Sequence, residues 1–177
     1  DNTVSVINGN TCNGTVTSGC GQTPATIAVG AAPRAVGIVN RTNTVFVGNR
    51  DDLTVSVIDG STCNGHNTSG CGQVPPTILL GAFPDTAGNN LTNILGPGIL
   101  VDSKKHTVYI PIIGDSDVAE LDANACRAGH VNDCHVKIVN KRMGGFSTAA
   151  EVDNATDTGY VESEAEDTVS LFRRSPY

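Results

Sequence analysis

The sequence has little of what most large apolar cores are built from. It contains no tryptophan and one methionine, and aromatic residues make up only 4% of its 177 positions. No apolar run approaches the roughly 20 residues that a membrane-spanning helix needs. Basic residues are also scarce, since 11 Lys and Arg against 18 Asp and Glu give a formal net charge of −7. We therefore expect no membrane span, and no nucleic acid or anionic lipid as a partner.

The residues that are abundant favour strands and turns. The chain has 20 glycines, and Val, Thr, Asn and Asp recur throughout. β-Branched residues favour strands, whereas Gly, Asn and Asp favour turns. An all-β fold with many short strands is predicted, in a chain long enough for one ordinary domain.

The cysteines are spaced regularly. Three Cys-x7-Cys pairs share one spacing: Cys12 and Cys20, Cys63 and Cys71, and Cys126 and Cys134. An even number of cysteines in fixed local pairs is typical of a disulfide framework formed in an oxidising compartment. The sequence thus predicts three disulfides and a secreted or cell-surface location.

Zinc binding is the alternative for the third pair. Two thiols with His130 and His135 would be an allowed zinc ligand set. At the position of His130, however, the first two pairs have Val16 and Asn67, and a glycine follows their second cysteine. Because only the cysteines are shared, disulfides are favoured and no metal site is assigned.

The chain is internally repetitive. Residues 1–14 recur almost unchanged as residues 52–65, an offset of 51. Equivalent strand starts at Thr3, Thr54, Asp117 and Thr168 are separated by 51, 63 and 51 residues. A second marker gives the same phase, since Thr44, Thr107 and Thr158 are separated by 63 and 51. The extra 12 residues indicate an insertion, which we place at Asp85–Pro97.

The residue pattern of each repeat predicts four short strands joined by polar turns. In the best-defined copy these strands are expected at 36–39, 44–48, 54–58 and 76–80. Four antiparallel strands in a period near 50 residues are typical of a β-propeller blade. The predicted boundaries are 1–51, 52–116, 117–166 and a partial repeat at 167–177, about three blades plus one strand.

The repeat resembles the YVTN-type β-propeller repeat. The matching segments are Thr44-Val-Phe-Val-Gly-Asn, Thr107-Val-Tyr-Ile-Pro and both copies of Thr-Val-Ser-Val-Ile, at Thr3 and Thr54. The third repeat departs from the pattern, with Val118-Ala-Glu-Leu in place of the last motif. The resemblance implies a propeller fold but no single activity, because propellers carry many unrelated functions.

Three repeats do not close a propeller ring, since known rings have roughly 4 to 8 blades. An open array exposes apolar sheet faces and strand edges. We therefore expect the chain to be part of a larger ring, or to be completed by association of copies through blade edges.

Clustered carboxylates in the last third suggest a second metal hypothesis. Glu162, Glu164 and Glu166 are expected to alternate along one strand and so to share a face. Hard cations such as Ca²⁺ take clustered carboxylate oxygens. A solvated strand face that blocks unwanted pairing is the favoured interpretation, and Ca²⁺ stays as the weaker alternative.

No catalytic residue or cofactor is assigned. The sequence has no nucleophile elbow, phosphate loop or His-Glu-x-x-His helix. Part of a propeller enzyme, such as a lactonase or lyase, remains an alternative function, because the resemblance includes enzymes of that kind.

The insertion is the predicted ligand-contact loop. Its polar residues Asp85, Asn89, Asn90 and Asn93 could contact sugar hydroxyls or a protein partner. The function expected from the sequence is an extracellular scaffold or binding module that presents loops for protein or carbohydrate contact. A structural surface-layer or filament subunit, formed by self-association, is the third alternative.

Overall fold

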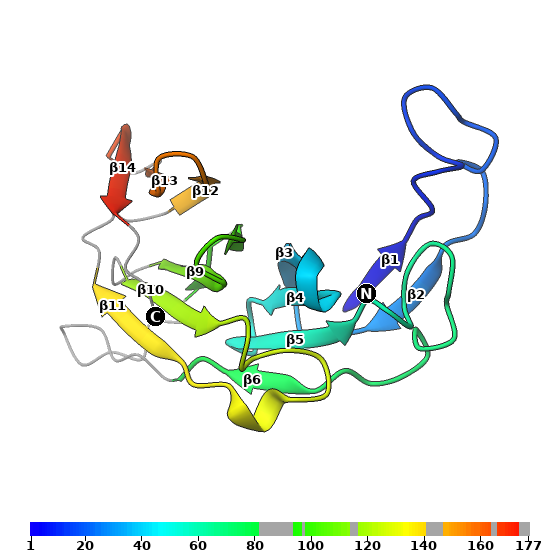
Figure 1. The fold of residues 1–177 in the computed structure, drawn as a ribbon, viewed down its shortest axis with the longest axis horizontal. Helices are drawn as coiled ribbons and strands as arrows, with labels where there is room; N and C mark the ends of the chain where they lie inside the picture. Colours follow the sequence, from blue (N-terminus) through cyan, green and yellow to red (C-terminus); the bar gives the residue numbers. More distant parts are fainter. Residues whose placement is uncertain (82–93, 97, 114–116, 141–146, 164–165, 174–177) are drawn as a thin grey trace.

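A computed structural model describes residues 1–81, 94–96, 98–113, 117–140, 147–163 and 166–173. Within these ranges the chain forms four antiparallel sheets that follow one another along an open arc (Figure 1). The only helices in the described ranges are two 3-10 turns, η1 (Asn40–Thr42) and η2 (Val131–Asp133). The expectation of an all-β, antiparallel fold is confirmed.

The sheets are numbered I to IV in chain order. Sheet I pairs β1 (Thr3–Val6) with β2 (Ala25–Ala28), and sheet II has the order β3 (Pro33–Val39), β4 (Thr44–Asn49), β5 (Thr54–Asp59) and β6 (Thr77–Leu79). In sheet III, β7 (Ile94–Leu95) and β8 (Leu100–Asp102) both pair with β9 (Thr107–Ile113), which is followed by β10 (Asp117–Asp122) and β11 (Lys137–Asn140). Sheet IV consists of β12 (Ser147–Asp153), β13 (Thr158–Ser163) and β14 (Thr168–Arg173).

The strands keep the spacing of the sequence repeats. β4, β9 and β13 begin at the three equivalent threonines, and the residue before each one has a positive φ. These residues are Asn43, His106 and Asp157, with φ of 48°, 55° and 56°. A short polar residue tolerates this left-handed conformation best, and two of the three are Asn or Asp. The same tight turn therefore joins β3 to β4, β8 to β9 and β12 to β13.

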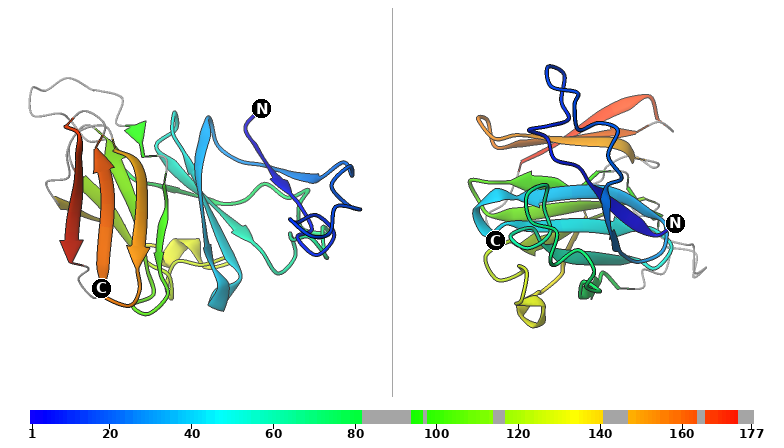
Figure 2. Two further views of the ribbon diagram at one scale, coloured as in Figure 1. Left: turned by 90° about the horizontal axis from the view of Figure 1, so that it is seen from above. Right: turned by 90° about the vertical axis from the view of Figure 1, so that its right-hand side faces the viewer.

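Successive sheets lie next to one another (Figure 2), and the apolar core lies between them. Phe46, Val55 and Val57 of sheet II pack with Ile110 and Leu121 of sheet III. A second apolar cluster joins sheets III and IV, and a third joins sheets I and II. Alternation along each strand thus supplies two apolar faces to a central sheet.

The structure differs from the predicted strands in detail. The strand expected at 36–39 begins earlier, at Pro33, and the one expected at 76–80 is shorter, at 77–79. β7 was not predicted, so sheet III has five strands. Sheets I and IV have two and three strands, and the arc is not closed in the described structure. No helix in the described residues has the length and hydropathy needed to cross a membrane.

Candidate binding surface

Three disulfide-closed loops project from the sheets. As predicted, the bonds join Cys12 to Cys20, Cys63 to Cys71 and Cys126 to Cys134, and no free cysteine is present. We call these loop 1, loop 2 and loop 3; they connect β1 to β2, β5 to β6 and β10 to β11. Because both sulfurs of loop 3 are in the disulfide, no thiolate is available there for zinc.

Loops 1 and 2 share one internal frame, built around the asparagine that follows the first cysteine. Asn13 Nδ2 donates to the Gly9 carbonyl (2.7 Å), and its Oδ1 accepts from the backbone N–H groups of residues 15 and 16 (both 2.9 Å). Asn64 makes the equivalent bonds to the Gly60 carbonyl (2.7 Å) and to the N–H groups of residues 66 and 67 (2.8 and 3.0 Å). One side chain therefore organises each loop from within.

Glycine is required on the opposite side of this frame. Gly70 lies against Thr62, such that a Cβ atom would sit 2.2 Å from the threonine Oγ1. Gly19 lies equally close to Thr11, at 2.3 Å. The two segments of each loop approach so closely there that a larger residue would push them apart.

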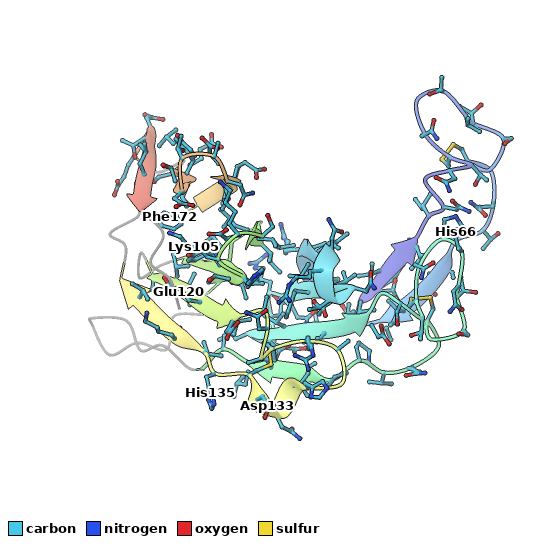
Figure 3. All side chains as sticks on the ribbon, in the orientation of Figure 1. His66, Lys105, Glu120, Asp133, His135 and Phe172 are labelled. Carbon is cyan, nitrogen blue, oxygen red and sulfur yellow. A yellow bond between two sulfur atoms is a disulfide. The ribbon has the colours of Figure 1, made fainter. Side chains whose placement is uncertain are left out.

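Loop 3 departs from the frame because Arg127 stands where the asparagine is expected. The Arg127 guanidinium donates to the Asn124 carbonyl, and the His130 N–H donates to the Arg127 carbonyl (2.9 Å). The 3-10 turn η2 follows directly. Figure 3 shows the nearby Asp133 and His135 on the outer side of the arc.

Loops 2 and 3 also contact the preceding repeat. In loop 3 the Ala128 N–H donates to Thr44 Oγ1 in sheet II (3.3 Å). In loop 2, Gly65 lies against Asn8, and His66 Nε2 is 3.1 Å from Asn10 Nδ2. Loop 1 extends away from the sheets, with exposed residues from 13 to 18 (Figure 1). Loop 3 therefore contacts sheet II and loop 2 contacts the base of loop 1, whereas residues 13–18 of loop 1 face solvent.

A hollow of about 270 Å³ lies beside loops 2 and 3. Its lining includes Ile27, Asp59, Gln73 and Gly129. The Ser61 hydroxyl donates to Asp59 Oδ1 (2.6 Å), and the Ser61 N–H donates to the same oxygen (2.9 Å). These bonds, the side-chain one first, hold the pKa of Asp59 below its ordinary value of 3.8. The hollow thus has one carboxylate that stays ionised at neutral pH.

Ser61→Ala is expected to raise the pKa of Asp59 toward its ordinary value, because the largest of the hydrogen-bond contributions is lost. A carboxyl with a depressed pKa stabilises the fold above its unfolded pKa, and this stabilisation disappears as the pH falls through the folded pKa. The measurement is a carboxyl-carbon NMR titration of the wild type and the variant. Ser69→Ala, an exposed position of loop 2, should leave the titration unchanged; an equal shift in both variants would contradict the assignment.

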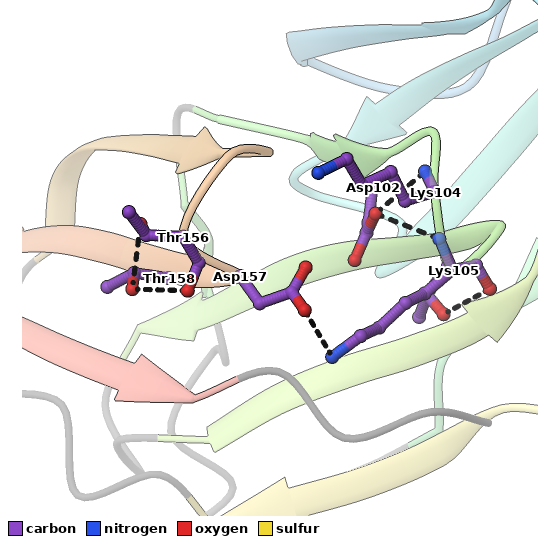
Figure 4. A network of polar contacts seen from close by, with 7 residues as sticks. Asp102, Lys104, Lys105, Thr156, Asp157 and Thr158 are labelled. Atoms are coloured by element: carbon purple, nitrogen blue, oxygen red, sulfur yellow. Dashed lines mark hydrogen bonds and ion pairs between the residues drawn. The ribbon is translucent and has the colours of Figure 1, made fainter.

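A polar network joins the β8–β9 turn of sheet III to the β12–β13 turn of sheet IV (Figure 4). Asp102 is fully buried, and its Oδ1 accepts from the N–H groups of Lys104 (2.9 Å) and Lys105 (3.0 Å). Lys105 Nζ reaches Asp157 Oδ2 in sheet IV at 3.6 Å. These groups bind one another, so the network supports the contact between the two sheets.

The predicted ligand-contact residues Asp85, Asn89, Asn90 and Asn93 lie outside the described residues. Glu164 also lies outside them, whereas Glu162 is exposed on β13 and Glu166 is in the turn that precedes β14. The expectation that the three glutamates alternate along one strand is wrong, because β13 ends at Ser163. In the described part of the chain, no three His, Cys, Asp or Glu side chains are grouped as a metal site would need.

Sequence reasoning missed a buried carboxylate. Glu120 on β10 is fully buried, and its Oε2 lies 3.3 Å from Lys137 Nζ on the neighbouring strand β11. The signal was present, since Glu120 belongs to the third-repeat segment that departs from Thr-Val-Ser-Val-Ile. Its repeat equivalent in sheet II is the core residue Val57. The charged residue at this otherwise apolar repeat position thus forms an ion pair between the neighbouring strands β10 and β11.

The chain matches no family model and no curated protein sequence. It is similar to solved structures of a protein from Lactobacillus plantarum (TM-score 0.62) and of hydrazine synthase from Kuenenia stuttgartiensis (TM-score 0.56), each at 15% sequence identity. The alignments cover 86% and 88% of this chain but only 41% and 49% of the other chains, so it spans less than half of either. Both are β-propeller folds. At this identity the likeness concerns the fold alone: the chain has a β-propeller-like arrangement of antiparallel sheets.

Proposed function

We propose that the chain is an extracellular scaffold of YVTN-type propeller blades that presents its disulfide loops for protein or carbohydrate contact. The observation that supports this most is that loops 1 and 2 keep the same internal hydrogen bonds but have different exposed residues at their tips. Asn13 and Asn64 make the same bonds, while the exposed tips differ, with Thr15 and Val16 in one loop and His66 and Asn67 in the other. Variable side chains on a rigid support are typical of binding surfaces.

The chemistry of the tips suits such a role. Loops 1 and 2 expose amide and hydroxyl side chains, which can donate to and accept from sugar hydroxyls or a protein backbone. Val16 is 42% exposed and adds an apolar contact to the tip of loop 1. The disulfides hold these groups in place, so that less conformational entropy is lost on binding. Three disulfides also fit an oxidising, extracellular location.

The test is binding of the labelled chain to an array of glycans and extracellular proteins. Val16→Asp and His66→Ala change the tips without removing the frame bonds of Asn13 or Asn64. We expect at least one of them to weaken a saturable signal about tenfold, a difference near 1.4 kcal/mol. Lys104→Ala, at an exposed position in the β8–β9 turn, is the matched control. No signal on the array, or one that no tip variant changes, would contradict the proposal.

Self-association is a second candidate, because apolar side chains are exposed on sheets II and IV. Val36 and Ile38 are exposed on sheet II, and Val169 and Leu171 on sheet IV. Sedimentation of the chain at several concentrations tests this alternative, and a constant monomer mass would contradict it. No observation in the described residues favours the enzyme alternative, although one of the similar structures is hydrazine synthase.

A further inference from the structure

The hollow beside loops 2 and 3 is formed by three successive sheets. Ile27 belongs to β2 of sheet I, Val57 to β5 of sheet II, and Gly129 to loop 3, which belongs to sheet III. Backbone bonds hold these walls in place, since the Val57 N–H donates to the Pro76 carbonyl (2.9 Å) and the Ala128 N–H donates to sheet II. The hollow is therefore a preformed feature of the contact between the sheets.

Asp59 gives this hollow a single charge. Among the residues that line it, all of which lie in the described ranges, Asp59 is the only one with an ionisable side chain. Its hydrogen bonds to Ser61 come from neutral groups, and no cation of the described residues forms an ion pair with it. Asp59 is exposed, so its charge stays in contact with water. The hollow thus combines apolar walls with one carboxylate whose charge no described neighbour neutralises.

The apolar surface extends outward from the hollow. Val74 lines it and is 86% exposed, whereas the equivalent residue of the first repeat is Thr23. Pro75 and Pro76 follow directly, and their rings restrict the backbone that carries Val74. A molecule that only filled the hollow would leave this side chain in water. The exposed rim therefore favours an occupant attached to a larger surface, such as a side chain of a protein.

We propose that this hollow binds a lysine side chain of a protein partner. The ammonium group lies beside the Asp59 carboxylate, and the four-carbon stem packs against Ile58 and Val74. Lysine suits this arrangement because its stem can cover apolar surface while its charge remains hydrated. The assignment rests on the proposed function, because it names the chemical group of the partner that the surface around loops 2 and 3 would hold.

Two observations favour lysine over other side chains. An arginine fork binds best to a carboxylate with two free oxygens, but Asp59 Oδ1 already accepts two hydrogen bonds from Ser61. An ammonium group is a compact charge that needs only one carboxylate oxygen. The formal net charge of −7 also attracts a basic partner surface and repels an acidic one.

The probe is the peptide acetyl-Gly-Lys-Gly-amide, titrated into the full, isotope-labelled chain. We expect saturable shifts of the amide NMR signals of Gly70 and Gly129, which line the hollow, with an affinity in the millimolar range. The same peptide with norleucine keeps the stem without the charge, and should bind about threefold more weakly. Butylammonium has stem and charge but no backbone to contact the rim, so it should also bind more weakly than the lysine peptide.

Two matched pairs of substitutions test the lining residues. Asp59→Asn removes the charge but keeps the turn, because the equivalent Asn8 accepts the same backbone bond from residue 10 (2.9 Å). It should weaken the lysine peptide about threefold and leave the norleucine peptide unchanged. Asp122→Asn, the same change in the third repeat and outside the hollow, is its control. Val74→Thr should weaken both peptides, whereas Val169→Thr, also exposed but on β14, should weaken neither.

Unchanged lysine affinity in Asp59→Asn would overturn the proposal, as would an equal loss in Asp122→Asn. Equal affinities for the lysine and norleucine peptides would exclude a role for the charge, and equal affinities for the lysine peptide and butylammonium would assign the hollow to a free amine. The array of glycans and proteins separates this outcome from the proposed function. Lysine binding without an array signal would contradict the proposed function alone, whereas an array signal that the tip variants weaken, without lysine binding, would overturn the lysine site alone.

Discussion

Phe46→Ala is expected to lower the free energy of unfolding by about 3–5 kcal/mol. The side chain is fully buried at the centre of the apolar cluster between sheets II and III, with Val55, Val108 and Leu121 as members of the same cluster. Close packing between two β-sheets leaves little freedom to fill the space of a lost ring. The measurement is denaturant-induced unfolding followed by circular dichroism.

The repeat offers a matched control for this prediction. Tyr160 occupies the position of Phe46 in sheet IV but is 36% exposed, because no described sheet covers that face. Tyr160→Ala should therefore cost about 1 kcal/mol or less. Equal losses for Phe46→Ala and Tyr160→Ala would contradict the claim that contact between successive sheets, rather than strand propensity, stabilises this fold.

The arrangement of strands could be predicted because it follows from local patterns. The three equivalent threonines mark the starts of β4, β9 and β13, and alternation of apolar residues sets which faces are buried. The short strand β7 could not be found in this way, since its two residues lie in a stretch without alternation. Burial of Glu120 depends on Lys137, a neighbour across the sheet that no local pattern reveals.

For the candidate surface, the disulfides could be predicted from the sequence, but the hydrogen bonds between distant segments could not. Comparison of the three cysteine pairs identified the disulfides, because the histidines of the third pair are missing from the others. The bond from Ala128 to Thr44 could not be predicted, because it joins residues 84 positions apart in two sheets. The Ser61–Asp59 hydrogen bonds are local, and a Ser two positions after an Asp in a turn could have indicated them.

Removal of the loop 2 disulfide by Cys63→Ala and Cys71→Ala is expected to destabilise the fold by about 3 kcal/mol. A crosslink that closes a short loop contributes roughly 2–3 kcal/mol by restricting the unfolded chain. Both sulfurs are also buried in the cluster between sheets I and II, with Ile27, Val47 and Ile58. Their loss removes apolar contacts as well, which adds to the effect of the freed loop. Denaturant unfolding of the double variant measures the sum.

Loop 1 is the control, since it has the same spacing and the same internal frame. Its cysteines are outside the buried clusters, and it extends from sheet I, which has only two strands. Sheet I can open locally before the rest unfolds. The double variant Cys12→Ala with Cys20→Ala should therefore lower the global free energy of unfolding by about 1 kcal/mol or less. Amide exchange in β1 and β2 should instead accelerate. If the two double variants lower global stability equally, sheet I unfolds together with sheets II to IV, and the crosslink in loop 1 stabilises the whole arc as strongly as the buried one.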